Sequence, residues 1–96
     1  MAQKPLHELT ATEIVAGRHS AEAVAQSCLE HIARREPAVQ AWQFLDPELV
    51  LQQARAIDKR SERGLLQGVP VGIKDIIDTA DMPTEYGTPI HAGHRP

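Results

Sequence analysis

One strand-like segment constrains this chain more than any other feature. Residues 68–78 read GVPVGIKDIID, in which β-branched Val and Ile residues lie between glycines, a composition typical of a buried strand. A strand is not stable alone in water, because it needs neighbouring strands to form a sheet. No other segment offers a convincing partner. The sequence therefore predicts a sheet whose other strands lie outside these 96 residues.

The N-terminal part of the chain predicts two helices. Thr10 and Glu13 form a capping-box pattern for a short helix, and Gly17 fits the left-handed position just past its end. Ser20 is a suitable cap for a second helix over residues 21–36. Apolar residues recur along this second helix at helical spacing, which predicts one buried stripe: Ala21, Val24, Ala25, Cys28, Leu29, Ile32 and Ala33.

Proline, aspartate and glycine residues predict where the next elements begin and end. Pro37 is expected to end the second helix, and residues 39–45 (VQAWQFL) form a short extended piece. A third helix begins with Asp46 as its cap and Pro47 at its first position, and Gly64 is expected to end it after a basic last turn. Its narrow apolar stripe consists of Val50, Leu51, Ala54 and Ile57.

The chain changes character from Gly64 onward, where five of the six glycines and four of the seven prolines are found. We expect a helical region over residues 1–64, then a strand and a loop over residues 65–96, with turns at Met82-Pro83 and Thr88-Pro89. The predicted fold class for the chain itself is mostly helical with one or two strands.

The composition of the chain limits its expected cellular location and binding partners. Hydrophobic residues make up 42% of the chain, which is typical of a globular domain. The net charge of -3 indicates no basic surface that would bind nucleic acid or anionic membranes. No segment has the run of about 18 apolar residues that a membrane span needs, and the N-terminus does not resemble a signal peptide. A single cysteine forms no internal disulfide, and a cytoplasmic location is expected.

Several candidate sites fail on the spacing or type of their residues. The glycine run before Lys74 lacks the spacing of a phosphate-binding loop, and an aspartate follows the lysine directly. His91 and His94 lie in a loop without an obvious third ligand, so no metal site and no cofactor are predicted. Cys28 lies on a buried stripe and reads as a small apolar residue rather than a nucleophile. Asp75 and Asp78 read as hydrogen-bonding or solvent-facing groups.

Lys74 is the unusual residue of the strand-like segment, because lysine is seldom buried without a partner. In extended geometry Lys74 shares a face with Gly72, which is expected to leave open space beside the amine, while Asp75 lies on the opposite face. Two interpretations remain from these residues alone. The lysine lies on apolar surface with its amine in water, or it performs chemistry.

The segment resembles the part of the amidase signature family that carries the catalytic lysine. That family has a pattern close to G-[IV]-P-[IV]-[GA]-[IV]-K-D, followed by spaced threonines and a glycine. The chain matches it at residues 68–75 and again at Thr79, Thr84 and Gly87. The upstream helices are also similar to the family's N-terminal region. The sequence around Lys74 most resembles small-amide amidases such as malonamidase.

The resemblance implies an α/β parent fold, a mixed sheet flanked by helices, and a serine hydrolase that uses no histidine. In this family a lysine takes a proton through a serine beside a cis peptide bond, and a second serine attacks the amide carbonyl. The resemblance assigns the role of base to Lys74. A lysine amine accepts a proton near neutral pH only when its surroundings, burial above all, lower its pKa.

The chain departs from the family in length and in its serines. Family members run to several hundred residues with both serines far downstream, whereas Ser20, Ser27 and Ser61 lie on or beside predicted helices. We therefore expect the chain to be the N-terminal piece of one amidase domain that cleaves a small carboxamide C–N bond. The piece alone is expected to be inactive. The alternatives are a non-enzymatic interaction module, a degenerate remnant, or part of the amidase subunit of an aminoacyl-tRNA amidotransferase. The expected partners are the remainder of the domain, the amide substrate and, through exposed apolar faces, further copies of the chain.

Overall fold

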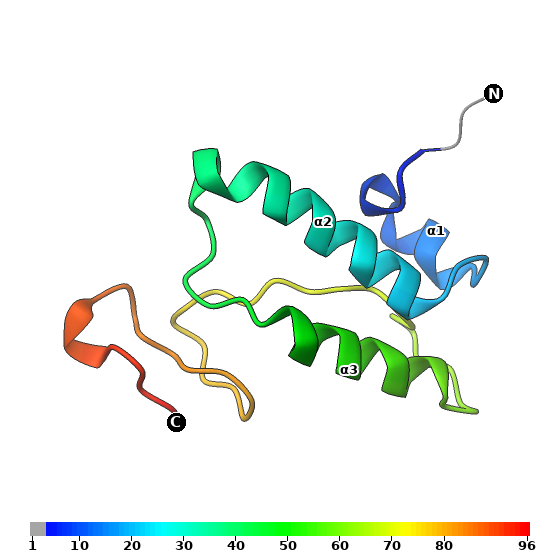
Figure 1. The fold of residues 1–96 in the computed structure, drawn as a ribbon. Coiled ribbons are helices and arrows are strands. Elements are labelled where there is room, and N and C mark those ends of the chain that lie inside the picture. Colours follow the sequence, from blue (N-terminus) through cyan, green and yellow to red (C-terminus); the bar gives the residue numbers. More distant parts are fainter. Residues whose placement is uncertain (1–3) are drawn as a thin grey trace. The chain divides into compact units, whose positions relative to one another are not determined.

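A computed structural model describes residues 4–96, which divide into two compact units. The helical unit consists of the described residues up to residue 40 together with residues 46–70. The lysine unit consists of residues 41–45 and 71–96. Figure 1 shows the elements in chain order, of which all but the last belong to the helical unit: η1 (Leu6–Glu8), α1 (Ala11–Val15), α2 (Ala21–Val39), α3 (Pro47–Asp58) and η2 (Pro89–His91).

The capping box at the start of α1 is confirmed. The Thr10 hydroxyl accepts a hydrogen bond from the Glu13 amide (3.2 Å), and the Glu13 carboxylate accepts one from the Thr10 amide (2.9 Å). These reciprocal bonds satisfy two of the amides that every helix leaves without an internal partner. Gly17 adopts the predicted left-handed conformation, with φ +80°, where a side chain would be strained.

The start of α2 is confirmed, but its predicted end is wrong. Ser20 caps the helix by accepting from the Ala23 amide (3.0 Å). The helix then continues through Pro37 to Val39. The proline removes one backbone donor, but the turn that contains it is closed by the Gln40 amide, which donates to the Glu36 carbonyl (2.8 Å). Gln40 is left-handed, with φ 52°, and ends the helix in place of the proline.

The start of α3 is also confirmed, and the helix ends earlier than predicted. Asp46 accepts from the backbone amides two and three residues further on, at 3.1 and 3.2 Å. The helix ends at Asp58, so the basic residues that follow do not form its last turn and Gly64 is not its end. The Ile57 carbonyl near the helix end accepts from the Arg60 amide (3.2 Å) and from the Gln67 side chain (3.1 Å), so its acceptors are used without a further turn of α-helix.

Helices α2 and α3 lie side by side in the helical unit (Figure 1), and small side chains hold them together. The core cluster consists of Ala21, Ala25 and Ala54, and the partly buried side chains of Val50, Leu51 and Ile57 pack against it. Alanine lets helix backbones approach closely while it buries apolar surface. Only the N-terminal half of the predicted α2 stripe is buried, because Leu29 and Ile32 remain half-buried and Ala33 is exposed.

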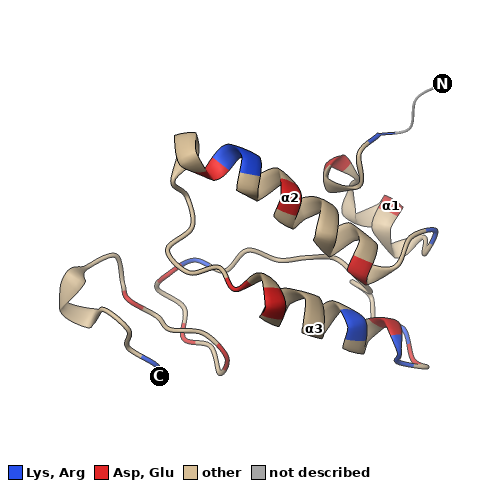
Figure 2. Ribbon diagram, in the orientation of Figure 1, with Lys and Arg blue, Asp and Glu red and all other residues tan. Residues whose placement is uncertain are grey.

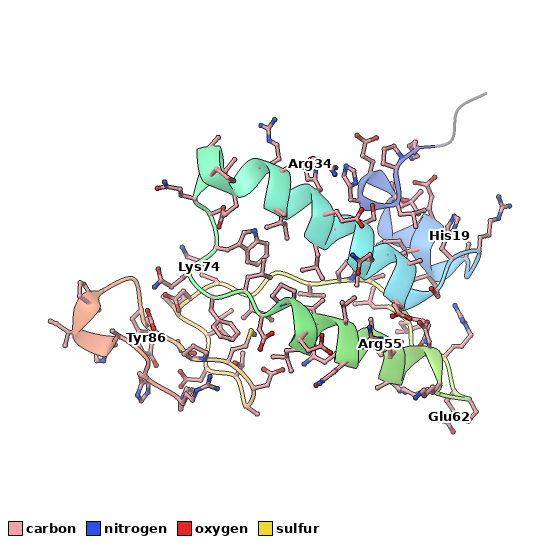
Figure 3. The ribbon with its side chains drawn as sticks, in the orientation of Figure 1. His19, Arg34, Arg55, Glu62, Lys74 and Tyr86 are labelled. Carbon is pink, nitrogen blue, oxygen red and sulfur yellow. The ribbon has the colours of Figure 1, made fainter. Side chains whose placement is uncertain are left out.

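Polar contacts between α2 and α3 supplement this core. The Asp58 carboxylate at the end of α3 accepts from the Ala21 amide (2.7 Å) and the Glu22 amide (3.0 Å), the first two amides of α2. Arg55 of α3 donates to the Glu22 carboxylate at 2.7 Å (Figure 3), and Figure 2 shows charges of both signs along the two helices. A carboxylate at a helix N-terminus is favourable both as an acceptor and as a charge.

The predicted strand does not form, and this expectation was wrong for the chain as it stands. Within residues 4–96 the structure contains no strand, neither over residues 68–78 nor over residues 39–45, of which Val39 is the last residue of α2. The physical reason is that a strand is defined by backbone pairing, and the described part of the chain supplies no second extended segment that pairs with either. The observed fold class is therefore mostly helical.

Candidate functional site

Lys74 lies in the lysine unit at the first position of a tight turn (Figure 3). The Ile77 amide donates to the Lys74 carbonyl (3.0 Å), which closes the turn directly after the lysine. The Lys74 side chain is exposed. Among the described residues no carboxylate forms an ion pair with its ammonium group. The lysine is therefore fixed by the backbone of the turn rather than by a charged partner.

Asp75, the next residue, makes the most hydrogen bonds in this segment. One carboxylate oxygen accepts from the Glu85 amide (2.8 Å), and the other accepts from the Gly87 amide (3.3 Å). The Asp75 carbonyl also accepts from the Tyr86 amide (2.9 Å). Three consecutive amides of residues 85–87 thus converge on one residue. The expected separation of Asp75 from Lys74 on a strand is replaced by a turn and a loop that bind the carboxylate.

The loop that binds Asp75 has an unusual backbone. Tyr86 and Gly87 are both left-handed, with φ 58° and 71°, and this conformation directs successive amides to the same side of the chain. The Tyr86 hydroxyl donates to the Asp78 carboxylate (2.7 Å), and this hydrogen bond raises the pKa of Tyr86. Asp75 and Asp78 are therefore both hydrogen-bonded groups, in agreement with the sequence-based interpretation.

Thr84 anchors the same loop from its other end. It is the buried polar residue of the lysine unit, only 1% exposed. Its hydroxyl donates to the Ile77 carbonyl (2.9 Å) and its amide donates to the His94 carbonyl (2.8 Å). Because a buried hydroxyl without a partner is costly, these bonds fix the loop to the turn that contains Lys74.

The space beside Gly72 is not open, contrary to expectation. A Cβ atom at Gly72 would lie 3.4 Å from the Trp42 ring, so the indole occupies the side that the missing side chain leaves. Sequence alternation identified the gap but not its occupant, because Trp42 is thirty residues earlier in the chain. A Cβ atom at this position would make an ordinary van der Waals contact with the ring, so Trp42 borders the lysine segment at Gly72.

The apolar residues around Lys74 are largely exposed. Val71 is 67% exposed, and the other large apolar side chains of this segment are also accessible: Ile73, Ile76 and Ile77. Such a concentration of accessible apolar surface is unusual for an isolated domain.

The remaining candidate residues lie apart from this arrangement. The thiol of Cys28 is partly buried, which raises its pKa and disfavours the reactive thiolate. The three serines of the sequence all belong to the helical unit, so the lysine unit contains none. Ser20 caps α2, and Ser27 accepts from the His7 amide (3.1 Å).

His91 and His94 form a ring cluster with Tyr86, in which the Tyr86 ring lies 5.3 Å from that of His91 and 6.3 Å from that of His94. Within residues 4–96 no three His, Cys, Asp or Glu side chains are grouped so as to hold a metal ion. In the same range, no helix combines the length and apolar character needed to cross a membrane.

Comparison of the sequence with known proteins identifies the protein family to which the chain belongs. A family model described as Amidase matches residues 23–96. The matched range includes most of α2, all of α3 and the whole lysine unit. The chain belongs to the amidase family, as the resemblance of residues 68–87 indicated.

Two groups of relatives carry different names. A Chloroflexus aggregans protein named as a subunit of glutamyl-tRNA(Gln) amidotransferase is 42% identical over 99 aligned positions, which cover 95% of this chain and 20% of that protein. A Mycobacterium bovis protein named as a putative amidase, AmiD, is 43% identical over 77 positions, which cover 76% of this chain and 16% of that protein. The chain thus spans about a fifth of the length of the curated relatives it matches. No solved structure matches it.

Proposed function

We propose that the chain supplies the lysine base of an amidase active site that cleaves a carboxamide C–N bond. The observation that carries this proposal is the Lys74 turn, whose following residue is bound by three consecutive loop amides. Four residues that match the family pattern build this turn and loop: Lys74, Asp75, Thr84 and Gly87. The pattern thus coincides with a hydrogen-bonded arrangement inside the lysine unit.

The proposed chemistry requires a nucleophile from outside the lysine unit. Lys74 would accept a proton through a bridging serine, and a second serine would attack the amide carbonyl to give an acyl-enzyme and ammonia. Water would then release the acid and restore the serine. Because the lysine unit contains no serine, both serines and the α/β sheet would come from the remainder of an amidase domain. Residues 1–96 alone would be inactive.

The exposed apolar surface beside Lys74 supports this requirement. Burial of Val71, Ile73 and Ile76 against further parts of the domain would remove apolar area from water and bring Lys74 into a drier setting. A drier setting favours a neutral lysine amine, the form that accepts a proton. In a chain without the remainder of the domain, the same surface would favour self-association.

A second candidate substrate class comes from the relatives. The identity to a protein named as part of an amidotransferase covers 95% of the chain, which favours a role in an aminoacyl-tRNA amidotransferase over a free-standing small-amide hydrolase. The net charge of -3 gives this chain no nucleic-acid surface of its own, so other parts of such a complex would bind the tRNA. The single, partly buried cysteine suits the cytoplasmic location expected for either enzyme.

The first test is the reading frame of the gene beyond codon 96. The proposal expects a serine- and glycine-rich segment that supplies the bridging and attacking serines. Absence of such a segment from every downstream frame would remove the amidase proposal and favour a non-enzymatic interaction module or a degenerate remnant.

The second test is ammonia release by the intact protein that carries residues 1–96, with L-glutamine and propionamide as probes. Lys74→Ala is expected to lower kcat by at least about 100-fold, because general-base catalysis contributes about 100- to 10,000-fold. Lys59→Ala, an exposed lysine at the end of α3, is the matched control and should retain activity. Turnover that survives Lys74→Ala would exclude the lysine from the reaction.

The same assay separates the two substrate classes. Hydrolysis of propionamide by the isolated protein indicates a small-amide amidase. Ammonia release from L-glutamine that rises when glutamyl-tRNA and the other components of the complex are added indicates an amidotransferase.

A further inference from the structure

We propose that Asp75 is a positioning residue, which fixes the backbone that carries Lys74 and thereby sets where the lysine amine lies. This inference rests on the proposed function, because it concerns the same base. Asp75 does not itself contact the reacting atoms. Its carboxylate acts on the loop of residues 85–87, and through that loop on the turn of residues 74–77.

The contacts of Asp75 hold the loop by both its side chain and its backbone. Its two carboxylate oxygens accept separately from the Glu85 and Gly87 amides, at 2.8 and 3.3 Å. Its carbonyl accepts from the intervening Tyr86 amide at 2.9 Å. Hydrogen bonds to an ionised acceptor are stronger than neutral ones. Asp75 is half-buried, which strengthens them further by limiting competition from water.

The turn is fixed on its other side as well. The Lys74 carbonyl accepts from the Ile77 amide (3.0 Å), and the Ile77 carbonyl accepts from the buried Thr84 hydroxyl (2.9 Å). The peptide bond between Lys74 and Asp75 therefore lies between two anchored points. A general base must lie within hydrogen-bond reach of the proton it takes, and a misplacement of about 1 Å can cost about 100-fold in rate.

The chemistry of the site selects aspartate over its nearest substitutes. Asparagine has one acceptor oxygen, so its NH2 group would face either the Glu85 amide or the Gly87 amide, donor against donor. Glutamate is one methylene longer and would push the loop away from the turn. The left-handed backbone of Tyr86, with φ 58°, is the strained element of the loop that the carboxylate stabilises, since a non-glycine residue rarely adopts this conformation.

The experiment compares Asp75→Ala and Asp75→Asn with Lys74→Ala in the intact protein, with whichever of L-glutamine and propionamide is hydrolysed faster. Both Asp75 variants should lower kcat, by about 10- to 100-fold for alanine and less for asparagine, while KM changes by less than about twofold. Hydrogen exchange of the residue 85–87 amides should accelerate in parallel. Asp78→Ala is the matched control, because Asp78 binds only the Tyr86 side-chain hydroxyl in this loop.

A merely structural role would give a different result. It would lower the melting temperature of the Asp75 variants while each folded molecule kept the wild-type kcat, and that outcome would overturn the proposal. A rise in KM with unchanged kcat, or an equal loss of kcat in Asp78→Ala, would overturn it as well. If Asp75→Ala does not fold, the kcat of Asp75→Asn becomes the test of the positioning role, because asparagine retains one acceptor oxygen and the full side-chain volume.

The Lys74→Ala variant separates this proposal from the proposed function. If Lys74→Ala abolishes turnover and the Asp75 variants do not reduce kcat, only the positioning role fails. If Lys74→Ala retains turnover, the catalytic assignment fails first and the positioning role fails with it.

Discussion

In the helical unit, alanine side chains on α2 and α3 meet in a small apolar core. In the lysine unit, backbone amides and a buried threonine hold a turn and a loop, while apolar side chains face outward. The helical unit buries an apolar core, although Leu65 and Leu66 remain exposed, whereas the large apolar side chains around Lys74 in the lysine unit are all accessible. Stability and the proposed chemistry therefore belong to different parts of one short chain.

This difference explains why the residues proposed for chemistry lie where the core is smallest. Local stability follows the density of buried apolar contacts, and functional segments come from the less stable end of that range. The lysine unit compensates with hydrogen bonds, which define geometry even where apolar burial is small. Its exposed apolar surface remains available for further parts of an amidase domain.

The largest expected effect tests the apolar core of the helical unit. Val24 is fully buried, so Val24→Ala removes two buried methyl groups and leaves a cavity. The free energy of unfolding should fall by about 2 kcal/mol, as measured by urea denaturation of the protein that carries residues 1–96.

Val71→Ala is the matched control in the lysine unit, because it is the same substitution at a side chain that is 67% exposed. Where no further part of the domain covers Val71, its effect should stay within about 0.5 kcal/mol. Equal losses for the two variants would contradict the contrast between a buried and an exposed apolar set. A Val71→Ala loss that appears only with a complete amidase domain would instead show that this domain covers Val71.

An intermediate effect tests the hydrogen-bonded lysine unit. Thr84→Val keeps the shape of the side chain but removes the hydroxyl that donates to the Ile77 carbonyl (2.9 Å). Loss of this bond at a buried site should cost about 1–2 kcal/mol, and hydrogen exchange should accelerate at residues 84–87. The control is Thr12→Val at an exposed position of α1, where exchange at residues 84–87 should not change.

The smallest effect concerns a surface charge of the helical unit. The Glu13 carboxylate accepts from Lys4 (2.7 Å) and from the Thr10 amide, and these bonds lower the pKa of Glu13 from 4.5 to about 2. Because the folded value lies below the unfolded one, its stabilising contribution is complete above pH 4.5 and disappears as the pH falls toward about 2.

An NMR titration of the Glu13 carboxyl group checks this window directly. Protection of the Thr10 amide from hydrogen exchange, relative to an unfolded chain at the same pH, should fall as the pH falls over the same range. Glu13→Gln keeps an acceptor for that amide and should abolish the pH dependence. A Glu13 carboxyl group that titrates near 4.5 would show that the capping box is weaker than its distances suggest.

The sequence predicted the starts of the helices better than their ends. Thr10, Ser20 and Asp46 cap their helices as expected because a cap is a contact between residues two or three positions apart. The ends at Pro37 and Gly64 were wrong because distant groups or later residues satisfy the last carbonyls. Gln67, for example, bonds to the Ile57 carbonyl ten positions earlier.

The candidate site was predicted in part. The pattern around Lys74 identified the family, which the match over residues 23–96 confirms, while the role of Lys74 itself stays a prediction. The contacts of Asp75 with residues 85–87 were missed because they join residues ten to twelve positions apart. The left-handed glycine at position 87 was the available signal, since it matched the family pattern without an assigned reason. The predicted strand was wrong because pairing depends on a partner that no local pattern supplies.

The contact between Trp42 and Gly72 gives the lysine segment an optical reporter. Trp42 is the one tryptophan among these 96 residues, and its ring lies 3.4 Å from the position of a Cβ atom at Gly72, two residues before Lys74. Indole emission depends on the polarity around the ring, and this ring is 41% exposed. In this chain the wavelength of tryptophan fluorescence therefore follows the surroundings of the lysine segment, without any attached dye.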